Sequence, residues 1–279
     1  MTWLAITLAA LGALCFAVAA WLQQAAVVDA GGLGFSGWLR VLRARRWLSG
    51  FGLTGVAAGL HACALGLAPL TVIQPVGAIA ITLTTMLASR SGSARPTRST
   101  WLAVVASTFG VGLFVLLSAR HAVMPTLSAA AEARAGILTA VGVVVLATTG
   151  TAVPGRVRCL AYAAAGGLAY GLVSVYVHSL AVDGIAHLHP LAVVGLLVAL
   201  PVGLWFVQHA YATGPPQVVI ACQTVVDPML GVGVGLGLFG EAGGLPGATA
   251  TVLVACAAVA VAGVILLARE HIRPQWSNP

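Results

Sequence analysis

The chain consists almost entirely of continuous apolar runs of about 20 residues, separated by short breaks at Pro, Gly and Arg. The runs do not alternate between apolar and polar positions, so they indicate helices and not the strands of a β-barrel. A helix of about 20 residues crosses the roughly 30 Å hydrocarbon core of a bilayer. The pattern predicts nine membrane-spanning helices: Trp3–Val28, Trp47–Leu67, Leu70–Ser89, Thr100–Ser118, Ala135–Val153, Cys159–Ala181, Pro190–Ala212, Pro216–Phe239 and Leu245–Ala268.

The composition excludes an ordinary soluble domain. Of the 279 residues, 60% are hydrophobic and 7% are charged, whereas about 25% of the residues of a globular domain are charged. In lipid every backbone N–H and C=O group needs a partner within the protein, so long apolar runs must be helical. We therefore expect an all-α membrane protein. The first run is expected to be a retained span, because a signal peptide begins with positive charge and the first basic residue here is Arg40.

The arginines predict the orientation in the membrane. If the loops alternate between two sides, eleven of the thirteen arginines fall on one side, and Arg120 and Arg134 fall on the other. The positive-inside rule places the side with eleven in the cytoplasm. We expect a multi-pass protein of the cell (inner) membrane with its N-terminus outside and its C-terminus in the cytoplasm. The net charge of +7 is then a topology signal and does not indicate a nucleic-acid partner.

Two fragments of the chain match in pattern: LTVIQP at Leu70–Pro75 and QTVVDP at Gln223–Pro228. Each follows a short turn that contains proline, and the order of spans around the two fragments is alike. This order predicts a first repeat of four spans at residues 1–118, a connector with a central span at 119–158, and a second repeat of four spans with a short tail at 159–279. A single linking span gives the two repeats opposite orientations, as in many secondary transporters.

The two regions that contain these fragments read GLAPLTVIQPVGAIAITL (Gly66–Leu83) and ATGPPQVVIACQTVVDPMLGVGVGLGLFGE (Ala212–Glu241). In these motifs and in the order of its elements, the chain resembles the drug/metabolite transporter superfamily, and in particular its EamA-like and NIPA-type (magnesium-transporter-like) branch. The closing Phe239-Gly240-Glu241 is similar to the family's LGE ending, whereas the first half has Ala88-Ser89-Arg90 there and lacks the Glu. The resemblance implies a substrate carrier with a central site.

Asp227 is the sharpest chemical signal, because it lies near the middle of the eighth predicted span. An ionised Asp at the centre of a bilayer costs about 2.5–3.5 kcal/mol, so it needs a polar cavity, a partner or a proton. One interpretation is a site that binds a cation or carries a proton coupled to transport. The other is a cap for a helix broken at Pro228, where the proline removes a backbone hydrogen bond. The sequence leaves both open.

Other polar residues in the spans are candidates for substrate binding. Gln74 and Pro75 are the repeat counterparts of Asp227 and Pro228, and Pro75 is expected to break its helix in the same way. Gln223 lies one turn before Asp227, on the same side of the helix. Tyr170, Ser174 and His178 are candidates because they form one polar face at i, i+4 and i+8. His61 and Gln24 are the remaining candidates. The alternative for His61 is a structural hydrogen bond between helices, and the alternative for Gln24 is a solvated helix end.

Three functions fit these residues. The first is a secondary transporter that moves a small solute or metabolite by alternating access, with or without proton coupling through Asp227. The second is a divalent cation (Mg²⁺) carrier of the NIPA type, and the third is a non-transporting membrane scaffold. We expect no enzyme, because no nucleophile–base set is visible, and no cofactor, because the five cysteines lack the spacing of metal ligands. The expected partners are a small solute or ion and the lipid bilayer, and a homodimer remains open.

Overall fold

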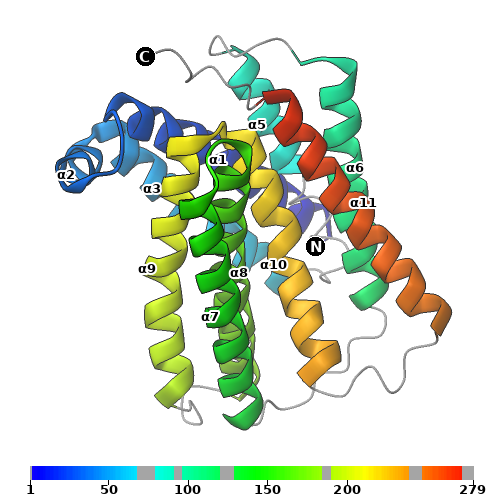
Figure 1. Ribbon diagram of the computed structural model, residues 1–279. Coiled ribbons are helices and arrows are strands. Elements are labelled where there is room, and N and C mark those ends of the chain that lie inside the picture. Colours follow the sequence, from blue (N-terminus) through cyan, green and yellow to red (C-terminus); the bar gives the residue numbers. More distant parts are fainter. Residues whose placement is uncertain are drawn as a thin grey trace.

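The regular structure of the chain is helical throughout the part that the computed structural model describes, which is residues 2–67, 79–90, 96–119, 129–183, 190–238 and 247–271. Ten helices lie in these ranges (Figure 1): α1 (Thr2–Asp29), α2 (Phe35–Arg43), α3 (Arg45–Leu67), α5 (Ile79–Arg90), α6 (Arg98–Ala119), α7 (Ala129–Ala152), α8 (Arg156–Asp183), α9 (Pro190–Thr213), α10 (Pro216–Leu238) and α11 (Gly247–His271).

Seven of the described helices are long and apolar enough to cross a membrane: α1 and α6 to α11. The prediction of an all-α membrane protein is therefore confirmed. The other two predicted spans coincide with α3 and α5, and α5 is a shorter apolar helix that occupies only Ile79–Arg90. The start of that predicted span, with Gln74 and Pro75, lies outside the described residues.

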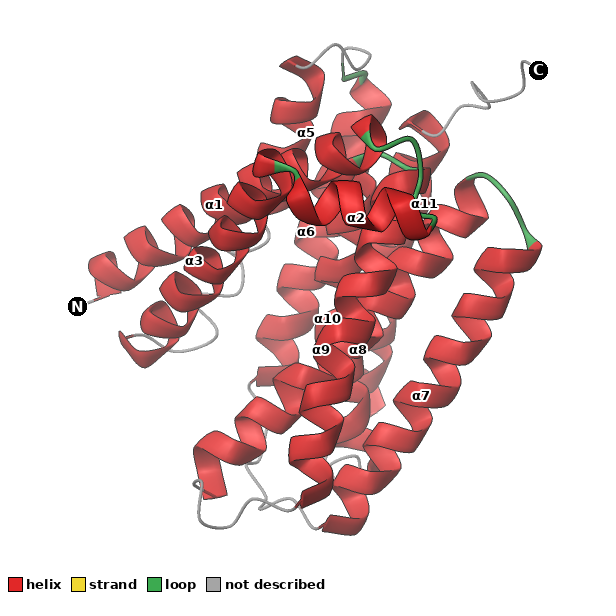
Figure 2. Ribbon diagram, turned by 90° about the vertical axis from the view of Figure 1, so that its left-hand side faces the viewer, coloured by secondary structure: helices red, strands yellow, loops and turns green. Residues whose placement is uncertain are grey.

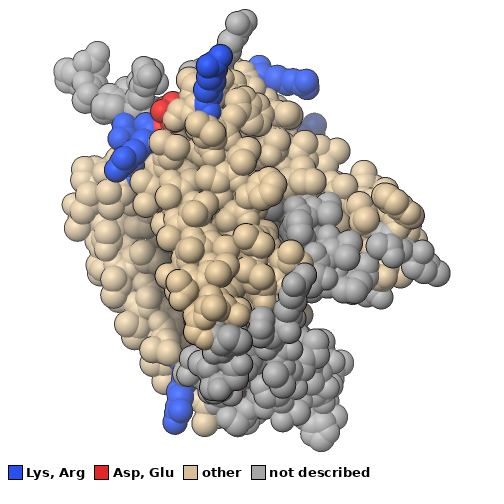
Figure 3. All heavy atoms as spheres, turned by 90° about the vertical axis from the view of Figure 1, so that its right-hand side faces the viewer, with Lys and Arg blue, Asp and Glu red and all other residues tan. Residues whose placement is uncertain are grey.

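Successive long helices run in opposite directions. In Figure 1, α3, α6, α8 and α10 begin at the upper end of the molecule, and α1, α5, α7, α9 and α11 end there. Nine of the ten described arginines belong to α2 or to helix ends at this upper end, which we call the arginine-rich end. Arg134 lies in the first turns of α7, which begins at the opposite end (Figure 1). On the face seen in Figure 3 the blue side chains lie at the two ends of the molecule, with an uncharged surface between them. The described arginines are thus segregated as the sequence predicted.

The helices pack in corresponding pairs. Helix α1 packs on α3 and on α5, and α8 packs on α9 and on α10 in the same order. Across the two sets, α5 contacts α10 and α6 contacts α11. The α6–α11 contact is close, because a Cβ atom built on Gly110 would lie 2.6 Å from the backbone nitrogen of Ala260. Small residues at such crossings allow helices to approach in lipid, where packing drives their association.

Helix α2 was not predicted, since the sequence analysis left residues 35–43 between the first two spans. Figure 2 shows α2 lying across the direction of α7 to α10, at the arginine-rich end. Val41 of α2 is completely buried, and the indole ring of Trp38 stacks on that of Trp205 in α9 with ring centroids 5.1 Å apart. The spacing of Trp38 and Val41 at i and i+3, with Arg40 and Arg43 on another side, is the amphipathic signal that could have revealed this helix.

The predicted helix break at Pro228 is wrong, because α10 continues through this residue to Leu238. A proline inside a helix removes one backbone hydrogen bond and clashes with the preceding turn, but membrane helices tolerate it when neighbouring helices and side chains satisfy the freed groups. Pro201 lies inside α9 in the same way. The short proline-containing turn predicted before the second fragment is present between α9 and α10, at Gly214 and Pro215.

Candidate functional site

Asp227 lies at the interface of α10 with α8, where its carboxylate has a polar partner. The hydroxyl group of Ser174 in α8 lies 3.3 Å from Oδ1 of Asp227 and donates a hydrogen bond to it. The two helices come close here because α8 has a glycine about one turn before Ser174. A Cβ atom on this residue, Gly171, would lie 3.0 Å from the backbone oxygen of Asp227. Asp227 itself is half-buried and Ser174 is exposed. Asp227 is therefore only partly enclosed by the described helices, and its carboxylate has one polar partner on α8.

Gln223 lies one turn before Asp227 and is buried at the same interface. Its backbone Cα is 3.4 Å from the position of a Cβ atom on Gly167 of α8. The side-chain oxygen Oε1 of Gln223 is buried and has no hydrogen-bond partner among the described residues. An unmade hydrogen bond of a buried acceptor costs about 1–3 kcal/mol. A carboxylate and an unsatisfied amide oxygen, one helical turn apart, suit a ligand that carries positive charge or N–H donors.

The other residues of the predicted polar face on α8 do not all join this pair. The ring of Tyr170 packs against α9, since a Cβ atom on Gly203 would lie 2.7 Å from its Cε1 atom. The backbone oxygen of Tyr170 lies 3.1 Å from the Ser174 hydroxyl, so the single hydroxyl proton is shared between this oxygen and Asp227. His178 follows one turn later on α8, but its side chain is outside what the structure describes. Ser174 is thus the one residue of this face that the described structure joins to Asp227.

His61 and Gln24 lie in helices that are not part of the α8–α10 interface. His61 is half-buried on α3, which approaches neither α8 nor α10 closely along its described length. Gln24 is half-buried near the end of α1. Gln74 and Pro75 lie outside the described residues, so their relation to Asp227 stays a prediction.

A second polar cluster, which we call the amide network, joins α1, α3 and α9. Gln208 of α9 donates through Nε2 to Oε1 of Gln23 at 2.6 Å, and its own oxygen accepts the indole N–H of Trp47 at 3.0 Å. Gln23 donates in turn to the hydroxyl of Thr54 at 2.9 Å. Gln208 is completely buried and Gln23 almost so. This network connects the first predicted repeat to the second.

The sequence analysis missed the amide network, although it carried a signal. Gln208 interrupts the apolar run of the seventh predicted span, and a polar side chain inside a membrane helix usually faces the interior of the bundle. Gln23 precedes Gln24, for which a solvated helix end was one of the two interpretations. The structure shows instead that Gln23 points into the protein, because the end of α1 is covered by α3 and α9.

Comparisons with protein-family models, curated proteins and solved structures found no significant match to this chain. Within the described ranges, no three His, Cys, Asp or Glu side chains gather closely enough to hold a metal ion together.

Proposed function

We propose that this protein is a secondary membrane transporter that moves a small solute by alternating access. The observation that carries the proposal is the Asp227 carboxylate in the middle of α10, which is hydrogen-bonded to Ser174 and lies one helical turn after Gln223, whose buried side-chain oxygen is unsatisfied. A carboxylate at this depth is costly unless a partner, a proton, water or a ligand compensates it. The Ser174 hydroxyl at 3.3 Å is a long and therefore weak partner, which favours a further role for water or a ligand. The site favours solutes with an amine or another cationic group, and Asp227 can also carry a proton coupled to transport.

The arrangement of the helices supports two inverted repeats, α1 to α6 and α8 to α11, joined by α7. Helix α1 packs on α3 and α5 as α8 packs on α9 and α10. Helix α1 ends at the arginine-rich end whereas its counterpart α8 begins there (Figure 1). This opposite direction is what inverted repeats require. In this topology α3 and α5 also span the membrane, giving nine spans.

The arginine-rich end is then the cytoplasmic face, with the N-terminus outside, by the positive-inside rule. In Figure 2 the α1–α3 pair diverges from α8 to α10 with increasing distance from this end. The amide network holds α1, α3 and α9 together at the end where they meet. We infer that the network closes the cytoplasmic side in this conformation and separates when the transporter opens inward.

The proposal is tested with purified protein in liposomes. A screen of amines, amino acids, nucleobases and sugars by thermal stabilisation identifies a ligand, because a solute that binds the folded state raises its stability. Uptake of the radiolabelled hit is then compared in the wild type, Asp227→Asn and Asp29→Asn. Asp227→Asn is expected to abolish both stabilisation and uptake, whereas Asp29→Asn, which makes the same chemical change at the membrane surface, is expected to retain them. Unchanged uptake by a well-folded Asp227→Asn protein would contradict the proposal.

Two further measurements separate the alternatives. Mg²⁺ entry into dye-loaded liposomes, lost in Asp227→Asn, would favour the divalent cation carrier. A membrane-impermeant thiol reagent is then applied to Ser174→Cys and Asp227→Cys in a background without the native cysteines. A transporter exposes these positions to water from at least one side, and complete protection from both sides would favour the non-transporting scaffold.

A further inference from the structure

The short helix α2 combines exposed apolar side chains with arginines at the arginine-rich end of the molecule. Leu39 and Leu42 are exposed, whereas Val41 is buried against the bundle. Arg40 and Arg43 lie on the same short helix. An amphipathic helix with arginines and exposed leucines, lying across the direction of the spans (Figure 2), is typical of an element in the membrane interface.

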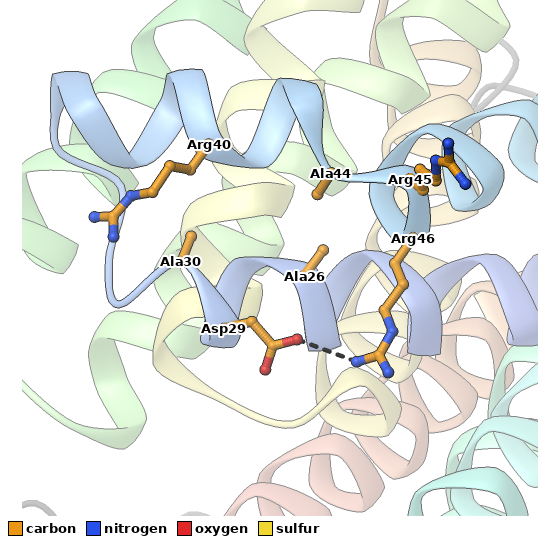
Figure 4. A pocket seen from close by; sticks show the side chains of 7 residues that line it. All are labelled: Ala26, Asp29, Ala30, Arg40, Ala44, Arg45 and Arg46. Atoms are coloured by element: carbon orange, nitrogen blue, oxygen red, sulfur yellow. Dashed lines mark hydrogen bonds and ion pairs between the residues drawn. The ribbon is translucent and has the colours of Figure 1, made fainter.

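A small cavity lies between α2, the end of α1 and the start of α3. It has a volume of about 240 Å³ and is lined by Ala26, Asp29, Ala30, Arg40, Ala44, Arg45 and Arg46. Figure 4 shows Arg46 directed at Asp29, and the two groups form an ion pair of 3.1 Å. Arg40 and Arg45 form no ion pair with any described residue. Three arginines against one carboxylate leave this cavity with an excess of positive charge.

The size and the chemistry of the cavity indicate its ligand. Its volume is below the roughly 300–1,000 Å³ of pockets that enclose drug-sized molecules, so it fits a single charged group. Guanidinium groups bind phosphate oxygens through paired N–H donors, and arginine is preferred to lysine for this geometry. Alanines complete the lining. In Figure 4 the side chains of Arg40 and Arg45 extend from opposite ends of the cavity, and both are exposed, so they are free to turn toward a bound group.

We propose that this cavity binds the phosphate of an anionic phospholipid, while α2 lies in the membrane interface with Leu39 and Leu42 toward the acyl chains. A phospholipid fits better than free phosphate because the charged cavity and the exposed leucines belong to one structural unit at the membrane surface. The stacking of Trp38 on Trp205 fixes this unit to α9. The site is separate from Asp227 and does not depend on the proposed transport.

The proposal is tested by titrating the purified protein in a neutral detergent with dioleoylphosphatidylglycerol, and measuring bound lipid by native mass spectrometry. The double variant Arg40→Ala/Arg45→Ala keeps the Arg46–Asp29 pair and is expected to weaken binding about fivefold for each arginine. The matched control Arg98→Ala/Arg269→Ala removes two charges from the same face, away from the cavity, and is expected to bind like the wild type. Asp29→Asn removes the one negative group and is expected to strengthen binding severalfold.

The outcomes are clearly separated. Weaker binding confined to the cavity variant, with stronger binding by Asp29→Asn, supports the site. Equal weakening in both double variants indicates diffuse surface charge and overturns it. If the zwitterionic lipid dioleoylphosphatidylcholine binds as strongly as dioleoylphosphatidylglycerol, the excess positive charge has no role, and the proposal is overturned. Sodium phosphate that displaces the lipid at equal concentration shows that free phosphate is the ligand, and this also overturns the lipid assignment.

Discussion

Gln208 and Gln23 are 185 positions apart in the chain, yet their side-chain amides meet at 2.6 Å in the interior of the protein. Each amide is also bonded to a residue of α3, Gln208 to Trp47 and Gln23 to Thr54. The pair thus connects three helices through one chain of hydrogen bonds. Because these amides are buried in the protein, where water does not compete, such a chain specifies which helices are neighbours.

Replacing Gln208 with leucine should destabilise the protein, because Gln23 and the indole N–H of Trp47 lose their partner together. The expected loss is about 1–3 kcal/mol, measured as a lower midpoint of thermal unfolding in detergent. Gln24→Leu, at the neighbouring position on α1, is the control and should have a smaller effect. The double variant Gln23→Leu/Gln208→Leu should lose less than the sum of its single variants. Strict additivity would show that the two amides are not coupled.

The close crossing of α6 and α11 predicts that two glycines of α6 respond differently to the same change. A Cβ atom on Gly110 would lie 2.6 Å from a backbone atom of α11, whereas one on Gly112 would meet nothing within 4 Å. Gly110→Ala should therefore destabilise the protein by about 1–3 kcal/mol. Gly112→Ala should be neutral or slightly stabilising, since alanine favours the helix. Equal thermal midpoints for both variants would argue against this crossing.

The stack of Trp38 on Trp205 should hold α2 on the bundle. Trp38→Ala removes this contact, which is worth about 0.5–1.5 kcal/mol beyond the buried area. Local opening of α2 should then become about tenfold more frequent, and trypsin should cleave after Arg40 and Arg43 correspondingly faster. Trp38→Phe should keep most of the protection. Trp3→Ala, at an exposed tryptophan, is the control for general loosening, and an equal rise there would contradict a specific role of the stack.

The approach of α10 to Gly171 should control the position of Asp227. A Cβ atom at this glycine would lie 3.0 Å from both the backbone oxygen of Asp227 and the side chain of Leu230. Gly171→Val should push the helices apart, lengthen the 3.3 Å contact of Ser174 with Asp227, and reduce uptake of the identified solute at least tenfold. Gly231→Ala in α10, where a Cβ atom has open space, should transport normally. Normal uptake by a folded Gly171→Val protein would show that this spacing is unimportant.

Much of the fold could be predicted from local properties of the sequence. Continuous apolar runs must be helical in lipid, and this rule alone was enough to predict the long helices. The arginines mark one end of the molecule because they lie in the loops and at helix ends there. Asp227 was recognised as a candidate site because a carboxylate in an apolar run is costly wherever the helix is placed.

Other features are invisible in the sequence because they depend on which helices become neighbours. Ser174 is the partner of Asp227 because it lies on the side of α8 that packs on α10, whereas the ring of Tyr170 packs against α9. Gln23 is buried in the amide network because α9 covers it, although the same residue at a free helix end would be solvated. Helix α2 is held by a tryptophan that is 167 positions away in the chain, from Trp38 to Trp205. Periodicity and composition describe each helix alone, whereas hydrogen bonds and ring contacts between helices exist only after the bundle has assembled.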